Sequence, residues 1–362
     1  MIVDWNRTAA AVVGEDARRP TAEPFVWYGF VSAAVYNAVV GIEGRYTPYK
    51  WHGREARARP GASSEAAAAT AARRVLLTYF PASKNRIETA YADSLAKIPY
   101  DRKPGPGVWR PTPPGNAPFG NTWLAKLRPM VAHSPDQFLP PPPPEPTSKR
   151  YARDLAEVKA VGAKKSTERT AWQTGTALFF SDPLPQQFQA AFRDHVTRHK
   201  LDVVEAARLF AALGTATADA TITTWNSRFT YALWRPITAI RLADTDGNPA
   251  TEADPSWEPL LDTPPHPEYM GDHCADDGAA MAVLDRLTGG DIDFRVSSKV
   301  TGTTRAYTRS ADFNRDVIGA RIWSGIHFRT ADVVGNRIGK EIGDWTLDHY
   351  FKERKGKSPS GV

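Results

Sequence analysis

Apolar residues recur at three- and four-residue spacing along most of this 362-residue chain. That spacing places them on one face of an α-helix, and no alternating run is long enough to predict a β-strand. The sequence therefore predicts an all-α fold, and we expect a helical bundle. The most apolar segment, residues 24–42, is expected to be a buried helix. The expected helices are residues 5–13, 24–42, 63–80, 84–98, 151–162, 167–180, 185–199, 203–225, 274–287, 312–326 and 331–349.

Two proline-rich segments interrupt this helical pattern. Residues 101–118 carry Pro-Gly-Pro-Gly and Pro-Thr-Pro-Pro, which predict a loop. Residues 139–146 include five consecutive prolines, which predict a stiff extended stretch. Such a stretch can link domains or bind a proline-reading domain, but we expect a strap lying across the helices. We therefore expect one domain, residues 1–362, with an N-terminal helical part (1–100), a Pro-rich strap (101–147) and an anion-site part (148–350).

The composition excludes several classes of protein. The single cysteine rules out an internal disulfide and a multi-cysteine metal site. No 18-residue apolar run predicts a membrane span, and the N-terminus lacks a signal-peptide pattern, so we expect a cytoplasmic protein. The net charge is +6, yet lysine and arginine are scattered among 40 acidic residues. We expect no nucleic-acid partner, and the basic balance suits an anionic small-molecule substrate.

Two pairs of residues form candidate anion-binding motifs. Arg228 and Arg235 lie seven residues apart, so they share one face if the segment stays helical, and Pro236 then ends the helix and exposes its end. These could be two surface arginines, but their aromatic neighbours argue against a fully solvated face. Arg321 and His327 lie six residues apart in an apolar segment, where a charged arginine needs an anionic partner. His327 is either a satisfied core histidine or a nucleophile or ligand.

A third motif, Gly271-Asp272-His273, lies at the expected start of the helix 274–287. Anions bind at helix N-termini, and a histidine there can act as a general acid or base. Asp272, Asp276 and Asp277 can simply favour the helix dipole. With a diphosphate substrate, the same three carboxylates could instead bind Mg²⁺, a cation that prefers oxygen ligands.

Taken in order, these three motifs resemble a known signature. Vanadium-dependent haloperoxidases and the type 2 phosphatidic acid phosphatase superfamily share Lys-x6-Arg-Pro, Ser-Gly-His and Arg-x5-His. Residues 228–236, 271–273 and 321–327 are similar to these motifs. The flanking residues 27–37, 104–114, 231–241 and 321–329 resemble soluble actinobacterial haloperoxidase-like members. The resemblance implies an all-helical bundle that holds an anion between its helices.

The resemblance also implies roles for individual residues. Arg235 and Arg321 would bind the oxygens of the anion. His327 would take up phosphorus or coordinate vanadium, and His273 would be the acid–base histidine.

Three positions depart from the signature. Arg228 replaces the lysine and keeps its charge. Gly271 replaces the serine and loses a hydroxyl bond to the anion. Asp272 replaces the glycine and brings a carboxylate next to the anion pocket, where like-charge repulsion should weaken vanadate or phosphate binding.

These departures favour a diverged, non-redox, vanadate-independent enzyme of specialised metabolism. We expect a lipophilic organic anion as substrate, either an isoprenoid (di)phosphate or a meroterpenoid intermediate. Phosphate removal, cyclisation or rearrangement would use His273, His327 and Asp272 for catalysis and the arginines for binding. The alternatives are a vanadium-dependent haloperoxidase, a cofactor-free isomerase or cyclase, and a non-catalytic binding protein. We also expect a homodimer. We expect no cofactor, except Mg²⁺ if the substrate is a diphosphate.

Overall fold

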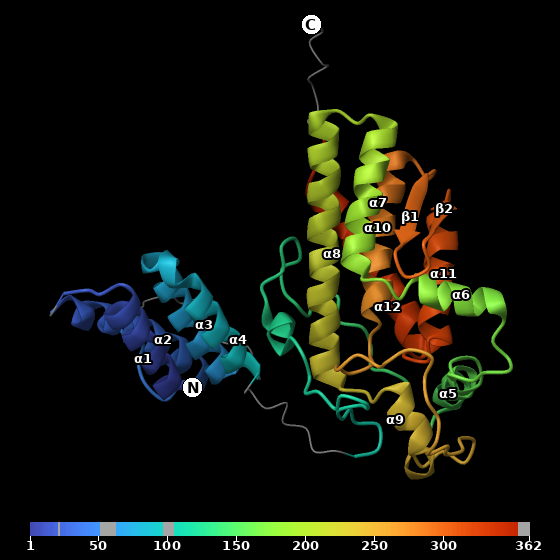
Figure 1. Cartoon of the computed structure of the whole chain (residues 1–362), viewed down its shortest axis with the longest axis horizontal. Coiled ribbons are helices and arrows are strands. Elements are labelled where there is room, and N and C mark those ends of the chain that lie inside the picture. The colour runs from blue at the N-terminus through green and yellow to red at the C-terminus, as the bar shows by residue number, and fades with distance from the viewer. Residues whose placement is uncertain (21, 51–62, 97–104, 354–362) are drawn as a thin grey trace, which may run out of the picture. The chain divides into compact units, whose positions relative to one another are not determined.

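The chain forms two compact helical units, residues 1–101 and 102–362 (Figure 1). The computed structural model describes residues 1–20, 22–50, 63–96 and 105–353. Residues 97–104 lie outside these ranges. They contain the boundary expected at residue 100, the end of the helix expected at 84–98 and the start of the loop expected at 101–118. The prediction of a mainly helical bundle fold is confirmed.

The N-terminal unit packs short helices around a small apolar core. Its helical segments are α1 (Ile2–Ala10), a π-helical turn η1 (Ala11–Asp16), α2 (Glu23–Glu43), α3 (Ser64–Tyr79), η2 (Pro81–Ser83) and α4 (Lys84–Ala96). Ser63 caps α3, because its side chain accepts a hydrogen bond from the Ala66 N–H at 3.0 Å. Trp5, Val12 and Leu76 are buried in the core of this unit.

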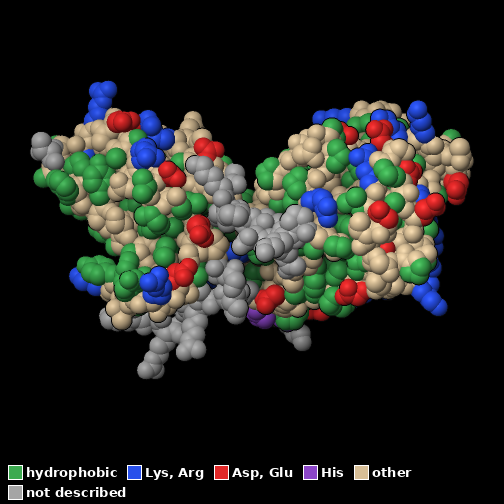
Figure 2. Space-filling view, turned by 90° about the horizontal axis from the view of Figure 1, so that it is seen from below, with side chains coloured by type: hydrophobic (Ala, Val, Ile, Leu, Met, Phe, Trp, Pro, Cys, Tyr) green, Lys and Arg blue, Asp and Glu red, His purple; other side chains and the backbone are tan. Residues whose placement is uncertain are grey.

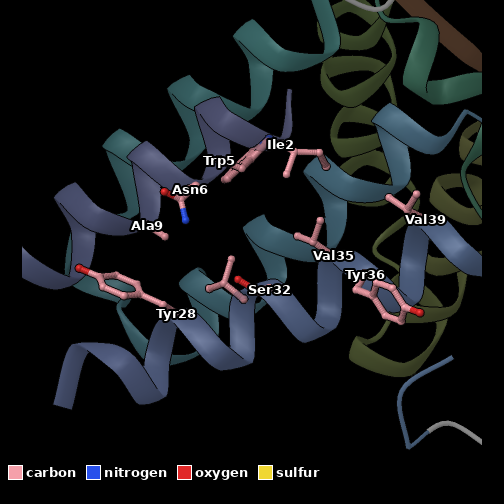
Figure 3. A pocket seen from close by; sticks show the side chains of 10 residues that line it. Ile2, Trp5, Asn6, Ala9, Tyr28, Ser32, Val35, Tyr36 and Val39 are labelled. Atoms are coloured by element: carbon pink, nitrogen blue, oxygen red, sulfur yellow. The ribbon is translucent and has the colours of Figure 1, made fainter. Parts of the chain in front are cut away.

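Helix α2 differs from the buried helix expected at residues 24–42. Within its unit it buries Val31, Val35 and Val40, whereas Phe25 is 77% exposed and Phe30 is 50% exposed. By length and composition alone α2 could cross a membrane, a test that core helices and signal sequences also pass. Figure 3 shows side chains of α1 and α2 facing each other across an apolar groove of about 290 Å³.

The C-terminal unit is built on a core of long helices. Helix α10 packs against both α8 and α12, which also contact each other, and α11 lies against α10 (Figure 1). The helical segments are η3 (Thr122–Lys126), α5 (Lys149–Val161), α6 (Ala171–Phe179), α7 (Leu184–His199), α8 (Val203–Tyr231), α9 (Pro236–Arg241), η4 (Ala243–Thr245), α10 (Asp272–Thr288), α11 (Ser310–Trp323) and α12 (Arg329–His349).

Glycines let α10 and α12 approach closely. A Cβ at Gly339 would lie 2.0 Å from the carbonyl oxygen of Ala275, and a Cβ at Gly335 would lie 2.5 Å from that of Gly271. Since no real side chain tolerates such contacts, these positions must be glycine for the observed spacing. This packing fixes the start of α12 against the start of α10.

Side chains of the bundle hold parts of the proline-rich segment 105–147 by hydrogen bonds. The buried carboxylate of Asp219 on α8 accepts hydrogen bonds from the backbone N–H groups of residues 130–132, at 2.6–2.9 Å. Further along, the Tyr231 hydroxyl donates to the Pro140 carbonyl and the Tyr269 hydroxyl to the Pro141 carbonyl. Side chains of the bundle thus hold this segment at two places, residues 130–132 and 140–141.

Two expectations for this unit are wrong. The sequence predicted no strand, but β1 (Phe294–Ser298) and β2 (Thr303–Tyr307) pair as an antiparallel hairpin. Each strand has only five residues, which is too short for an alternation of apolar and polar residues to predict a strand. The segment from Arg228 to Arg235 also does not stay helical, because α8 ends at Tyr231 and Ala232 has a φ of 51°. The predicted exposed helix end is instead buried, and Arg235 is the N-cap of α9.

Candidate active site

The predicted site residues meet at one end of the bundle. Arg228 comes from the last turn of α8 and Arg235 from the start of α9. The segment 271–273 opens α10, Arg321 lies in the last turn of α11, and His327 precedes α12. We call these residues, together with Glu268, the polar cluster. Most of the cluster is buried, whereas the side chains of Asp272 and His273 are 17% and 21% exposed.

Asp272 faces into the cluster. Its Oδ1 atom lies 3.0 Å from Arg228 Nη2, 3.5 Å from His273 Nδ1 and 3.8 Å from His327 Nε2. Burial by itself would raise the pKa of Asp272, but Arg228 and His273 lower it well below its ordinary value. The residue is therefore an ionised carboxylate at neutral pH. In sequence it stands where the family signature has the glycine of Ser-Gly-His.

Arg235 is fully occupied by protein partners. Its Nε donates to the His266 carbonyl at 2.8 Å, and its Nη1 lies 3.0 Å from Glu268 Oε2 and 2.7 Å from the Ile326 carbonyl. The other terminal nitrogen, Nη2, lies 2.7 Å from His266 Nδ1. Burial lowers the pKa of Arg235 to about 10, so it stays charged at neutral pH. No nitrogen of this guanidinium is left without a partner.

Glu268 is a site residue that the sequence analysis missed. Its Oε1 accepts the Phe328 N–H at 2.7 Å and lies 3.0 Å from His327 Nδ1, while Oε2 meets Arg235. Burial raises the pKa of Glu268, and the Arg235 guanidinium opposes that shift. Because Arg235 and the Phe328 N–H can only donate, the geometry fits the ionised carboxylate. The available signal was a carboxylate within an apolar stretch, three residues before Gly271.

The two predicted histidines are both neutral but differ in their surroundings. Burial, followed by the charge of Arg321, lowers the pKa of His273. Burial, followed by the charge of Arg235, lowers the pKa of His327 well below its ordinary value. His327 is held on both sides, with Nδ1 at 3.0 Å from Glu268 and Nε2 at 3.0 Å from Arg235. His273 is the histidine with solvent access.

Some buried polar atoms of the site have no hydrogen-bond partner among the described residues. These include Nε and Nη1 of Arg228, Nε of Arg321, and both carboxyl oxygens of Asp277. The Arg321 Nη1 atom makes only a long contact of 3.5 Å with the Phe180 carbonyl. Since buried polar groups are normally satisfied, these donors and acceptors are available to water or to a bound molecule.

Gly271 lacks not only the hydroxyl of a serine but also the space for one. A Cβ at this position would lie 2.2 Å from Oδ1 of Asp332, a buried residue in the first turn of α12. Asp332 also lies 3.9 Å from His327 Nδ1. No sequence motif marks Asp332 as a site residue, and only the contact between α10 and α12 reveals it.

The remaining acidic residues give no support to a Mg²⁺ site. Asp276 accepts a hydrogen bond from the Thr221 hydroxyl at 3.0 Å, and Asp277 is fully buried. Burial raises the pKa of both carboxyls well above the ordinary value, which favours their neutral forms. Within the described ranges, no group of three or more His, Cys, Asp or Glu side chains is arranged to hold a metal ion.

Known proteins resemble this chain in sequence and in fold. Residues 208–356, which contain the whole polar cluster, match the family described as the VCPO second helical-bundle domain. Over this part of its length the chain is similar to the vanadium haloperoxidase superfamily. It is 25% identical over 182 residues to vanadium chloroperoxidase from Curvularia inaequalis, which covers 40% of this chain and 29% of that protein.

Solved structures show the same fold over most of the chain. A bacterial vanadium-dependent iodoperoxidase aligns with a TM-score of 0.61 at 23% identity, covering 89% of each chain. A bacterial vanadium-dependent chloroperoxidase aligns with a TM-score of 0.53 at 15% identity, covering 90% of each chain. At these identities the likeness concerns the fold alone.

The residues of this site do not fit vanadate, the group that the names of these relatives imply. Asp272 already pairs with Arg228, and Glu268 already pairs with Arg235. Within the part of the chain that the structure describes, only Nε and Nη1 of Arg228 and Nε of Arg321 remain as buried arginine donors of the cluster without a partner. An entering oxyanion would meet the carboxylates of Asp272 and Glu268 beside Arg228 and Arg235, and position 271 offers it no hydroxyl. Such like-charge contacts in a buried site are strongly unfavourable.

Proposed function

We propose that this chain is a vanadate-independent, non-redox enzyme that rearranges or cyclises an organic substrate by proton transfer. The observation that carries this proposal is the pair formed by the ionised Asp272 and the neutral His273. Their side chains lie beside each other, with 3.5 Å between Asp272 Oδ1 and His273 Nδ1, and both are partly exposed. A neutral imidazole next to a carboxylate is a suitable general base.

In this proposal each residue of the pair has a separate role. His273 accepts a proton from one atom of the substrate and returns it to another atom of the product. The negative charge of Asp272 stabilises the imidazolium that forms in between. Arg228 keeps Asp272 ionised during this step, because it lowers the pKa of that carboxyl. His327 positions the cluster through Glu268 and Arg235 and does not act as a nucleophile, since both ring nitrogens are engaged.

A second substrate class, a lipophilic (di)phosphate, has one supporting observation. The nitrogens of Arg228 and Arg321 that lack partners could donate to phosphate oxygens. In this case the arginines bind the substrate, and the same Asp272–His273 pair moves the proton.

Three further expectations stay predictions: a role in specialised metabolism, a cytoplasmic location and a homodimer. Light scattering would measure the oligomeric state. Figure 2 shows basic and acidic side chains interspersed on the visible surface. The absence of a nucleic-acid partner stays a prediction.

The proposal is tested by turnover without vanadate, peroxide or Mg²⁺. The candidate substrates are uncharged prenylated aromatic molecules and prenyl diphosphates. We expect Asp272→Asn and His273→Gln to lose roughly 10²- to 10⁴-fold in kcat/KM, the usual contribution of general acid–base catalysis. Glu341→Gln and His349→Gln, two exposed positions on α12, are matched controls that should retain full activity.

Three outcomes would contradict the proposal. Halide-dependent dye bromination by the wild type with vanadate and peroxide would identify a haloperoxidase. Unchanged turnover in both site variants would remove Asp272 and His273 from the mechanism. Saturable binding without turnover of any candidate would favour a binding protein.

A further inference from the structure

The contact between Gly271 and Asp332 links the departures from the family signature to a residue on another helix. Any side chain at position 271 would begin 2.2 Å from Asp332 Oδ1 and 3.3 Å from Asp332 Cα. Non-bonded heavy atoms do not approach to 2.2 Å, so a serine at 271 and the observed carboxyl group at 332 exclude each other. Position 271 must therefore be glycine as long as the Asp332 side chain keeps its observed position.

The backbone cannot relieve this conflict by moving apart. The glycines of α12 hold its first turns against α10, and the Gly271 N–H donates to the Ala331 carbonyl at 3.1 Å. Asp332 is itself completely buried, and its neighbours at the site are His327, Arg321 and the Cys274 thiol. A substitution at position 271 must therefore displace the Asp332 side chain into a packed interior.

We infer that Asp332 is a specificity-determining residue that closes the oxyanion site by filling the place of a side chain at position 271. Asp272 and Glu268 complete this closure, because their carboxylates already pair with Arg228 and Arg235. An oxyanion that binds Arg228 Nη2 or Arg235 has to displace these internal carboxylates, and one that binds the remaining donors of Arg228 lies next to the charge of Asp272. An uncharged molecule can use the remaining donors and acceptors without this repulsion. The site therefore selects uncharged polar substrates over phosphates and vanadate.

This inference rests on the proposed function only in calling the bound molecule a substrate. The preference for uncharged molecules over oxyanions is tested by binding measurements alone. The double variant Gly271→Ser/Asp272→Gly restores the Ser-Gly-His order of the family signature. Adding Asp332→Ala also removes the carboxyl group that blocks position 271. Adding Asp332→Asn instead keeps a group of the same size there and is the matched control.

The readouts are orthovanadate binding, followed by ⁵¹V NMR line width, and inorganic phosphate binding, followed by calorimetry. We expect the wild type, the double variant and the Asn-containing triple variant to bind both ions weakly. The Ala-containing triple variant should bind them at least about tenfold more tightly, a gain that one relieved contact readily supplies. Equal affinities of the double and Ala-containing triple variants, or tight binding by the wild type, would overturn the inference.

A stability measurement keeps the test open if the triple variant fails to fold. Gly271→Ala should lower the Tm of the wild type, because its Cβ meets Asp332. The same change should lower the Tm much less in the Asp332→Ala background, where the oxygen is gone. Equal losses in the two backgrounds would contradict the steric link. The two proposals can fail separately. If the Asp272 and His273 variants keep full turnover, the proposed function is wrong. The closure of the oxyanion site still stands if the binding and Tm results are as expected.

Discussion

At the scale of single residues, carboxyl groups decide what two arginines of the polar cluster, Arg228 and Arg235, can bind. Asp272 and Glu268 supply negative charge from within the chain, at 3.0 Å from Arg228 and Arg235. An arginine paired in this way keeps its charge but loses its attraction for an external anion. The same pairing leaves an ionised carboxylate beside the neutral His273, which is what proton transfer requires.

The Asp332 carboxyl gives a prediction about pH and stability. Burial raises its pKa to about 8, although Arg321 opposes that shift. The folded protein therefore retains a proton that the unfolded chain releases near pH 4, so this group costs stability as the pH rises from about 4 to 8. Asp332→Asn does not titrate, and its Tm relative to the wild type should rise between pH 5 and pH 8.

Thermal unfolding at several pH values measures this difference. Asp348→Asn, at an exposed carboxyl in an ion pair with Arg286, is the control, and its Tm difference should stay nearly constant. The expectation is wrong if Asp332→Asn behaves like Asp348→Asn across the same pH range.

At the scale of the elements, the α10–α12 contact positions the site. Gly335, Gly339 and Gly343 lie on one face of α12, and a Cβ at any of them would meet the backbone or a side chain of α10 within 2.6 Å. This face lets the first turn of α12 bring Asp332 against Gly271. A bulkier residue in the series would separate the two helices and open the polar cluster.

Gly339→Ala tests this role of the α12 glycines. Its methyl group would lie 2.0 Å from the Ala275 carbonyl oxygen, and we expect a loss of about 2 kcal/mol in the free energy of unfolding, as for other overpacked cores. Gly214→Ala on α8 is the control, because no atom lies within 4 Å of its added methyl group. The control should gain up to about 1 kcal/mol from helix propensity.

Urea unfolding followed by circular dichroism measures both variants. If Gly339→Ala is as stable as the control, the helices can separate at no cost, and the close approach of α10 and α12 does not fix the site.

At the scale of the C-terminal unit, one buried carboxylate ties the strap to the bundle. Asp219 accepts three backbone N–H groups from residues 130–132, which places a chain segment nearly ninety residues away against α8. Further contacts from Tyr231 and Tyr269 to the proline carbonyls continue this attachment. The strap is thus part of the packed unit and is not a free linker.

Asp219→Ala should release this part of the strap. The variant leaves backbone N–H groups without an acceptor, and we expect a loss of about 3 kcal/mol in the free energy of unfolding. Cleavage between residues 127 and 139 in limited proteolysis should become faster. Asp219→Asn keeps one acceptor oxygen and should lie between the wild type and Asp219→Ala, whereas unchanged proteolysis in both variants would show that other contacts hold the strap.

Most of the helical pattern could be predicted because it depends on local spacing. The helices at residues 151–162, 185–199 and 331–349 were placed within a few residues of α5, α7 and α12. The hairpin formed by β1 and β2 was missed because its stability comes from packing against α7 and not from its own five-residue strands. The exposure of α2 was missed because periodicity shows which residues are apolar and not what covers them.

The sequence alone determined the helical fold class and the presence of an altered oxyanion motif, since both depend on residue spacing along the chain. Only the tertiary structure decided which charges meet. Glu268 lies 33 residues from Arg235 and Asp332 lies 61 residues from Gly271, and no spacing rule connects them. The sequence motifs predicted an anion site of three arginines and two histidines. The structure shows that buried carboxylates of the chain itself lie beside these residues.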